Sequence, residues 1–253
     1  GGVGVPQVAE DRPFPPLVLP GGTVASEKPG NVDPLVVALH GAGGDERQLV
    51  PYLKDSTQNV VFLRAPLRQK EGFQWLTSRI KVTPTAKLLT ELERVAGGLR
   101  PALAAAKAQR GASRLVVVGY SQGGHLAWWL AAQGVVDGAV VVNGALPADF
   151  KVPRPHRRTF IYWLSGVEDR TVPWELVRET VGGFRSAGYD IDGHQVKAGH
   201  SLSSVGPGIG AHIGGALVKT SGSGPMPTSR YCDHIFFSMR CFLRAKAPSE
   251  PGF

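Results

Sequence analysis

The pentapeptide Gly119-Tyr120-Ser121-Gln122-Gly123 places a serine between two glycines in the pattern G-x-S-x-G. An apolar run typical of a strand precedes it at 114–118, and a segment rich in Ala, Leu and Trp, typical of a helix, follows it. At such a strand-to-helix turn the glycines let the two elements approach closely, and the serine oxygen projects above the sheet. The helix N-terminus there also favours developing negative charge. The pattern therefore predicts Ser121 as the nucleophile of an acyl transfer.

A serine nucleophile needs a general base, and the base needs an acid that holds it in the right orientation. With the nucleophile first in the chain, the acid is expected next and the histidine last. Asp169 follows an expected strand at 159–164, and His200 follows the last expected strand, directly after a glycine. Both side chains are thus expected at the same edge of the sheet as Ser121. We predict Ser121, Asp169 and His200 as a catalytic triad.

Other acidic and histidine residues remain weaker alternatives for the acid and the base. Asp149 follows the preceding strand and could replace the predicted acid. His212 and His234 lie in the C-terminal segment and could replace the predicted base. His194 is expected at the exposed start of a strand, and His125 is expected in a helix, as a packing or surface residue.

The segment from His40 to Asp45 reads His-Gly-Ala-Gly-Gly-Asp and follows the apolar run at 35–39. In folds with a G-x-S-x-G turn, a loop at this place supplies one backbone N–H to the oxyanion hole, and the residue after the nucleophile supplies the other. We therefore predict Ala42 and Gln122 as oxyanion donors, each contributing about 3–4 kcal/mol to transition-state stabilisation. His40 is expected to be structural, bonding backbone groups of its loop. A phosphate-binding loop is the competing interpretation, but no G-x-G-x-x-G or G-K-[ST] accompanies it.

Strands and helices alternate in the part of the chain that carries these residues. Continuous apolar runs predict buried strands, with a shorter sixth strand last, at 35–39, 59–63, 114–118, 139–142, 159–164 and 192–197. Helical spacing predicts helices at 86–109, 122–133 and 174–187, the first of which Gly97, Gly98 and Pro101 would break or kink. The alternation predicts an α/β fold, with a mostly parallel central sheet flanked by helices on both faces. Only residues 143–158 separate the fourth and fifth strands, so no large lid domain is expected.

The sequence resembles the α/β-hydrolase superfamily of serine esterases over about residues 34–203. The segments that carry the resemblance are the glycine loop at 40–45, the G-x-S-x-G turn with the glycine after it, residues 166–173 and Gly199-His200. Within the superfamily it is similar to the small carboxylesterase, phospholipase and acyl-protein thioesterase group, and to poly(3-hydroxybutyrate)-depolymerase-like esterases. The resemblance implies the triad and oxyanion donors named above, with no metal and no cofactor.

The 253 residues are expected to form a single α/β-hydrolase domain. Residues 1–33 are rich in proline and predict an extended N-terminal arm with short edge strands near 16–19 and 23–26. Residues 201–253 depart from the resembled group: a Gly/Ser-rich stretch at 201–224, expected to be flexible, precedes an apolar stripe from Ile235 to Leu243. The stripe predicts a closing helix that docks on the chain itself or on a second copy, so a monomer and a homodimer both remain open.

Composition narrows the classes of function. The formal charge is +8, but there is no run of five Lys or Arg and no nucleic-acid motif, so no nucleic-acid partner is expected. No apolar run approaches the roughly 18–20 residues of a membrane-spanning helix. Cys232 and Cys241 are expected to be free thiols rather than one disulfide. The start at Gly1 without Met is compatible with a removed signal peptide, and a cytoplasmic location is slightly favoured.

A site without a lid favours a small-molecule ester with a short-to-medium acyl chain. Trp75, Leu76 and Leu146 are expected to line it, with core packing as the equal alternative for Trp75. The predicted function is ester hydrolysis through an acyl-enzyme on Ser121. Because the same triad serves thioesters and amides, a thioesterase or a peptidase remains an alternative. A binding protein on a hydrolase scaffold is less favoured, since no triad member is missing.

Overall fold

The computed structural model describes residues 14–220. In this range eight strands form one sheet in the order β1-β2-β4-β3-β7-β8-β9-β10, and a separate hairpin pairs β5 with β6. The strands are β1 (Pro16–Leu19), β2 (Thr23–Lys28), β3 (Asn31–Leu39), β4 (Gln58–Leu63), β5 (Leu67–Gln69), β6 (Gly72–Gln74), β7 (Leu115–Tyr120), β8 (Gly138–Val142), β9 (Phe160–Gly166) and β10 (Asp190–Val196). The helices are α1 (Val50–Leu53), α2 (Thr85–Gln109), α3 (Gln122–Ala132), α4 (Trp174–Ala187), α5 (Leu202–Val205), the 3₁₀ turn η1 (Gly206–Gly208) and α6 (Ile209–Thr220).

The six strands from β4 to β10 in the sheet order run parallel, whereas β1 and β2 are antiparallel to their neighbours. Val37 in the middle of β3 pairs with Val61 of β4 and Val117 of β7, and all three are fully buried. This burial explains the continuous apolar runs, because helices cover both faces of the sheet. The mostly parallel α/β fold and the two short N-terminal strands expected from the sequence are confirmed. Only β1 lies at the sheet edge, because β2 pairs with β1 on one side and with β4 on the other.

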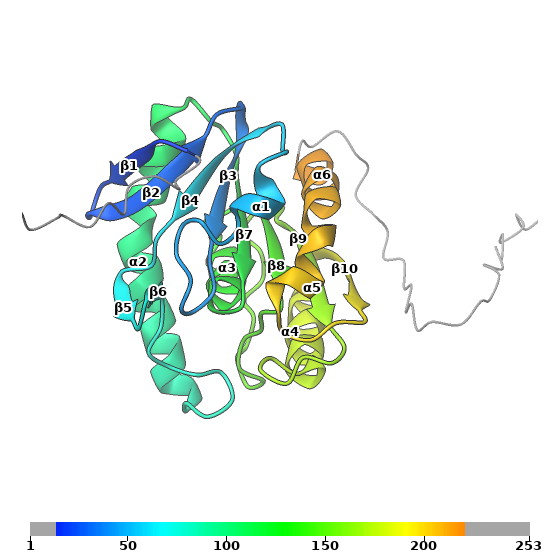
Figure 1. Cartoon of the computed structure of the whole chain (residues 1–253). Coiled ribbons are helices and arrows are strands. Elements are labelled where there is room, and N and C mark those ends of the chain that lie inside the picture. The colour runs from blue at the N-terminus through cyan, green and yellow to red at the C-terminus, as the bar shows by residue number, and fades with distance from the viewer. Residues whose placement is uncertain (1–13, 221–253) are drawn as a thin grey trace, which may run out of the picture.

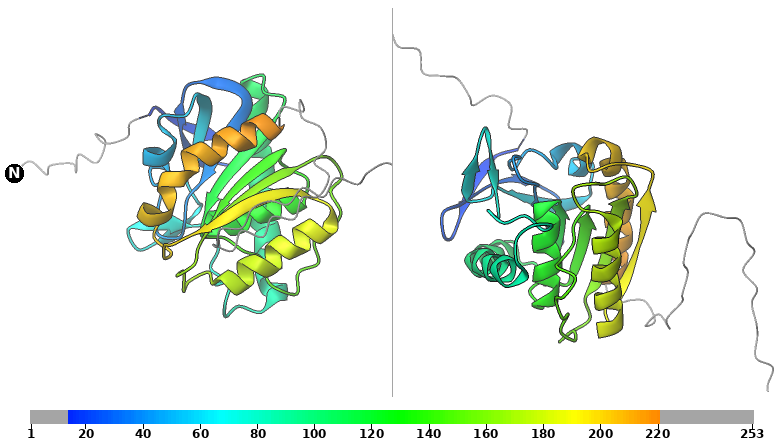
Figure 2. Two further views of the ribbon diagram at one scale, coloured as in Figure 1. Left: turned by 90° about the vertical axis from the view of Figure 1, so that its right-hand side faces the viewer. Right: turned by 90° about the horizontal axis from the view of Figure 1, so that it is seen from below.

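The molecule has three layers, with the sheet in the middle (Figures 1 and 2). Helices α2, α3 and α4 pack on one face, where side chains such as Leu92, Trp128 and Phe184 form one core cluster. Helices α1, α5 and α6 cover the other face, where Leu53 and Ile209 belong to a second cluster. The buried sheet thus positions the loops that follow the carboxyl ends of its strands.

The expectation of a flexible stretch at 201–224 is wrong for residues 202–220, which form α5, η1 and α6. Leu202, Val205, Ile209 and Ile213 recur at helical spacing and are buried against the sheet. Burying this stripe outweighs the low helix propensity of the intervening glycines. The predicted closing helix at Ile235–Leu243 and both cysteines lie outside the described residues, as do residues 1–13 of the N-terminal arm.

Helix α2 is one continuous helix of 25 residues, despite Gly97, Gly98 and Pro101. Its buried stripe, which includes Leu92, Leu99 and Leu103, holds the helix against the sheet on both sides of these residues. Of the two outcomes expected here, a break or a kink, the break is therefore excluded, because packing of the buried stripe overrides the local propensity of these residues. Between residues 14 and 220, no helix has the length and apolar character needed to span a bilayer.

Candidate active site

Ser121 sits at the turn between β7 and α3 with φ 54° and ψ −115°. Positive φ is unfavourable for a residue with a side chain, so the turn is strained. A Cβ atom on Gly119 would collide with the carbonyl oxygen of Gly123, and one on Gly123 would collide with that of Leu39. The two motif glycines are therefore required because strand, turn and helix approach each other at backbone contact.

The structure brings the three predicted triad residues into hydrogen-bond contact. His200 Nε2 lies 2.8 Å from Ser121 Oγ, and His200 Nδ1 lies 2.7 Å from Asp169 Oδ2. These residues follow β7, β9 and β10, whose carboxyl ends meet at the lower edge of the sheet in Figure 1. The Asp169 side chain is fully buried, whereas 24% of the His200 side chain is exposed. A substrate can therefore reach the serine and the imidazole, but water does not reach the carboxylate.

Backbone groups fix the orientation of the Asp169 carboxylate. Its Oδ1 accepts hydrogen bonds from the N–H groups of Thr171 at 2.8 Å and Val172 at 2.9 Å. This leaves Oδ2 free to accept a hydrogen bond from the His200 Nδ1–H group. The tautomer with a proton on Nδ1 has its lone pair on Nε2, which faces Ser121 and can act as a base.

The alternative candidates for the acid and the base that the structure describes make contacts outside the triad. Asp149 is exposed and accepts a hydrogen bond from the Thr85 hydroxyl. His194 bonds the Tyr162 hydroxyl, and the ring of His212 stacks on the Tyr162 ring. His234 lies outside the described residues.

The loop that carries Ala42 lies against the nucleophile turn. A Cβ atom on Gly41 would be 3.3 Å from the Cβ of Ser121. Within the described residues, neither the backbone N–H of Ala42 nor that of Gln122 has a hydrogen-bond acceptor. Both groups are thus available to a ligand oxygen beside Ser121, and their role as oxyanion donors stays a prediction.

The ring of His40 bonds backbone groups, as expected from the sequence. Nε2 accepts the N–H of Ala65 at 2.9 Å, which leaves the proton on Nδ1 to donate to the Gly41 carbonyl at 2.7 Å. Burial lowers the pKa of His40, so the ring stays neutral and keeps these two roles. His40 therefore holds the glycine loop in place.

The segment from Phe73 to Ser78 connects the two candidate oxyanion donors. At one end, the Phe73 carbonyl accepts the N–H of Gly43, the residue after Ala42. Further along, the side-chain oxygen of Gln122 accepts the N–H groups of Trp75 and Leu76, while its Nε2 donates to the Leu76 carbonyl at 2.9 Å. The Gln122 side chain thus fixes the distance between the two loops.

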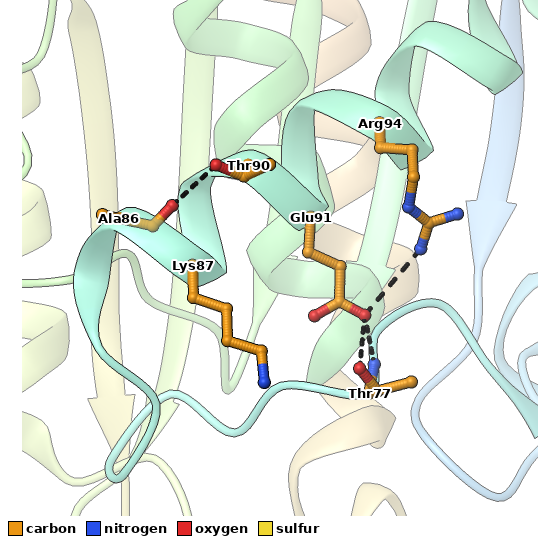
Figure 3. Close-up of a pocket in the computed structure, with 6 residues that line it drawn as sticks. All are labelled: Thr77, Ala86, Lys87, Thr90, Glu91 and Arg94. Atoms are coloured by element: carbon orange, nitrogen blue, oxygen red, sulfur yellow. Dashed lines mark hydrogen bonds and ion pairs between the residues drawn. The ribbon is translucent and has the colours of Figure 1, made fainter.

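Helix α2 anchors the far end of this segment through Glu91. Its carboxylate accepts hydrogen bonds from the N–H and hydroxyl of Thr77 and from the N–H of Ser78. Figure 3 shows Glu91 reaching from α2 toward Thr77, with Lys87 and Arg94 along the same side of the helix.

A cavity of about 470 Å³ lies beside Glu91, and a second cavity of about 400 Å³ lies further along α2. No triad residue lines either cavity.

The expected pocket walls are packed in the core instead. Trp75 and Leu76 are fully buried and Leu146 is 1% exposed. The Trp75 indole N–H donates to the His40 carbonyl at 2.8 Å, which shows that this side chain supports the glycine loop. These three side chains present no surface to a ligand in this structure, so the expectation that they line an open pocket is corrected.

Two residues that the sequence analysis did not single out contact the backbone of the histidine loop. The hydroxyl of Tyr120 and the side-chain amide of Asn143 both donate to the His200 carbonyl. The only sequence signal is their position, since each lies at the carboxyl end of a buried strand. Their contacts with the His200 carbonyl could not be predicted from sequence, because they depend on the conformation of the loop that carries His200.

His125, one turn into α3, is expected to make the stability of the folded chain depend on pH. Burial lowers its pKa to about 4, and its Nδ1 accepts the N–H of Ala145 at 3.1 Å. The unfolded chain takes up a proton near pH 6.5 and the folded chain only near pH 4, so stability falls as the pH drops through this window. We expect a loss of about 2–3 kcal/mol between pH 7.5 and 4.5 from this residue alone.

Urea unfolding of the wild type and of His125→Asn at the two pH values measures this contribution. Asparagine keeps an acceptor for the Ala145 N–H but has no titrating group. The variant should lose about 2–3 kcal/mol less stability than the wild type on acidification. Identical pH dependence in the two proteins would show that His125 is not buried in its neutral form.

The chain is similar to known hydrolases in sequence and in fold. The dienelactone hydrolase family matches the sequence over residues 64–212, more than half of the chain. The carboxylesterase of Bacillus cereus superposes with a TM-score of 0.67 at 19% identity, over 78% of this chain and 94% of that chain. A carboxylesterase from Mesorhizobium loti gives a TM-score of 0.65 at 22% identity, over 80% and 99% of the two chains. At these identities the two enzymes show the fold alone. No curated protein matches this sequence.

The family match has a definite place in the structure. It begins at the residue after β4 and ends within α6, so it includes the strand-turn-helix of Ser121 and the loops of Asp169 and His200. The match and the shared fold therefore cover the part of the chain where these three side chains meet. The chain belongs to the dienelactone hydrolase family of α/β-hydrolases, and this membership makes it a carboxylic ester hydrolase.

Proposed function

We propose that this hydrolase works through an acyl-enzyme on Ser121. The observation that carries the proposal is the continuous hydrogen-bonded chain from Ser121 Oγ through the His200 ring to Asp169 Oδ2. In the first step, Ser121 Oγ attacks the ester carbonyl while its proton moves to His200 Nε2. Asp169 stabilises the resulting imidazolium and holds the ring in place. The proton then passes to the alkoxide oxygen, and the alcohol leaves.

Deacylation repeats the same steps with water. His200 Nε2 takes a proton from the attacking water, and the tetrahedral intermediate collapses to release the acid and restore Ser121. In both steps the carbonyl oxygen becomes negative. The N–H groups of Ala42 and Gln122 are the donors that would stabilise this charge, each by about 3–4 kcal/mol.

The surroundings of Ser121 favour esters with a short-to-medium acyl chain. The residues between β8 and β9 form neither a helix nor a strand, so no lid domain is inserted at this place in the described part of the chain. Ser121 is 8% exposed, and the apolar side chains behind the turn are packed in the core. A short acyl group can meet Ser121 from the surface without displacing these side chains.

A series of p-nitrophenyl esters from acetate to dodecanoate tests the acyl preference, together with acyl thioesters and peptide anilides. We expect the highest kcat/KM for acyl chains of about two to eight carbons, and slower turnover of longer esters, because a longer chain would have to displace buried side chains around Ser121. Faster cleavage of the thioesters or anilides than of any ester would show that esters are not the preferred substrate class. The triad mechanism would be unaffected by this result.

A further inference from the structure

The backbone carbonyl of His200 accepts hydrogen bonds from two side chains at the ends of adjacent strands. The Tyr120 hydroxyl donates to it at 2.7 Å from the last residue of β7, and Asn143 Nδ2 donates at 3.1 Å from the residue after β8. Asn143 Nδ2 also lies 3.3 Å from the carbonyl of Gly199. These bonds tie the histidine loop to the strand that carries Ser121 and to the strand beside it.

Asn143 also contacts the end of β9, from which the Asp169 loop departs. Its Oδ1 accepts the N–H of Gly166 at 2.9 Å, and its own backbone N–H donates to the Leu164 carbonyl at 2.9 Å. A Cβ atom on Gly166 would collide with the carbonyl oxygen of Ala198, so β9 and the histidine loop meet at backbone contact here. A single side chain therefore connects the loop of the base with the strand that leads to the acid.

The backbone of Asn143 is held in an unfavourable conformation at this junction. Its φ is 47°, and the residue is fully buried. Positive φ is uncommon outside glycine, although asparagine tolerates it better than most residues. A turn that needed only this backbone shape would be better served by glycine. The amide, which uses both its donor and its acceptor atoms, gives a reason for the asparagine.

We propose that Asn143, together with the Tyr120 hydroxyl, is a positioning residue that sets where the His200 ring lies between Ser121 and Asp169; this inference rests on the proposed serine mechanism. Displacement of a reacting group by about 1 Å can reduce the rate about 100-fold. The loop that carries His200 is therefore held at its own carbonyl by two donors. Burial raises the pKa of Tyr120 to about 12, so its hydroxyl stays a donor at every assay pH.

Asn143→Gly removes the side-chain amide without straining the backbone, because glycine adopts positive φ readily. We expect kcat for a p-nitrophenyl ester, and the rate of Ser121 labelling by a fluorophosphonate, to fall about 10–100-fold. KM should change less than about threefold, because Asn143 is buried and does not face substrate. Asn143→Asp should lose more, since its carboxylate would face the carbonyl oxygens of Gly199 and His200.

Tyr120→Phe removes the second donor and keeps the ring. We expect kcat to fall about 3–10-fold, which corresponds to the loss of one ordinary hydrogen bond. Because the two donors share one acceptor, either can partly hold the loop when the other is missing. The double variant Tyr120→Phe/Asn143→Gly should therefore lose more activity than the product of the two single effects.

Matched controls separate positioning from a general loss of stability. Asn59→Ser and Tyr189→Phe change a buried asparagine and a buried tyrosine near the amino ends of β4 and β10, at the edge of the sheet away from Ser121. They should lower the urea midpoint while kcat and the labelling rate stay within about twofold of wild type.

The inference is overturned if Asn143→Gly and Tyr120→Phe keep kcat and the labelling rate within about twofold of wild type, or if the controls lose as much as they do. Should Asn143→Gly fail to fold, Tyr120→Phe with its own control still decides the point. The failure of the proposed function itself would look different. In that case wild-type Ser121 would not be labelled at all, or Ser121→Ala would hydrolyse esters.

Discussion

Ser121→Ala is expected to abolish ester hydrolysis while the protein keeps its fold. Removal of the nucleophile from a serine hydrolase lowers kcat about 10⁶-fold, and only background catalysis from the remaining site is left. The alanine side chain fits wherever the serine side chain fits, so far-ultraviolet circular dichroism and the urea midpoint should change little. Kinetics with p-nitrophenyl butyrate measure the loss of turnover.

Ser121→Gly is the matched control for the strained turn. It removes the same hydroxyl but accepts the positive φ at this position without steric cost. Both variants should be inactive, and the glycine variant should be at least as stable as the alanine variant, although glycine usually destabilises a folded chain. Turnover within about 100-fold of wild type in either variant would show that another group performs the attack.

Asp169→Asn is expected to lower kcat about 10⁴-fold and to leave the fold intact. Since Oδ1 accepts the N–H groups of Thr171 and Val172, the amide oxygen of the variant would take that place. The amide nitrogen would then face His200 Nδ1, where two donors cannot bond. The imidazole would turn to the wrong tautomer and lose its lone pair toward Ser121.

Asp149→Asn supplies the control for this substitution. Asp149 follows the neighbouring strand, but its carboxylate bonds Thr85 at the surface. Its variant should keep kcat within about twofold of wild type. The assignment of the acid is wrong if Asp149→Asn loses activity and Asp169→Asn retains it.

The sequence predicted the strands and the meeting of the triad residues because both follow from local patterns. Buried parallel strands give continuous apolar runs, and a strand order with right-handed crossovers brings their carboxyl ends to one edge. A polar residue within a few positions after such a run is therefore near the site wherever it lies in the chain. This holds for Ser121, Asp169 and His200, which are up to 79 residues apart.

Other features could not be predicted because they depend on tertiary packing. Trp75 looks the same in sequence whether its ring faces a ligand or the core, and only the fold shows that its indole bonds the His40 carbonyl. Helix α6 forms because Ile209 and Ile213 are buried on the sheet, against the propensity of their glycine neighbours. The role of Asn143 depends on a loop 57 residues away and on a positive φ that no sequence pattern reveals.

In the proposed mechanism, Ser121 becomes acylated with the help of His200 and Asp169. Mass spectrometry of the protein after reaction with a fluorophosphonate, and after rapid acid quenching during turnover of a p-nitrophenyl ester, tests it most directly. We expect one adduct per chain on the peptide that contains Ser121, no adduct in Ser121→Ala, and much slower adduct formation in Asp169→Asn. Ester hydrolysis at an undiminished rate with no adduct on Ser121, or with the adduct on another residue, would contradict it.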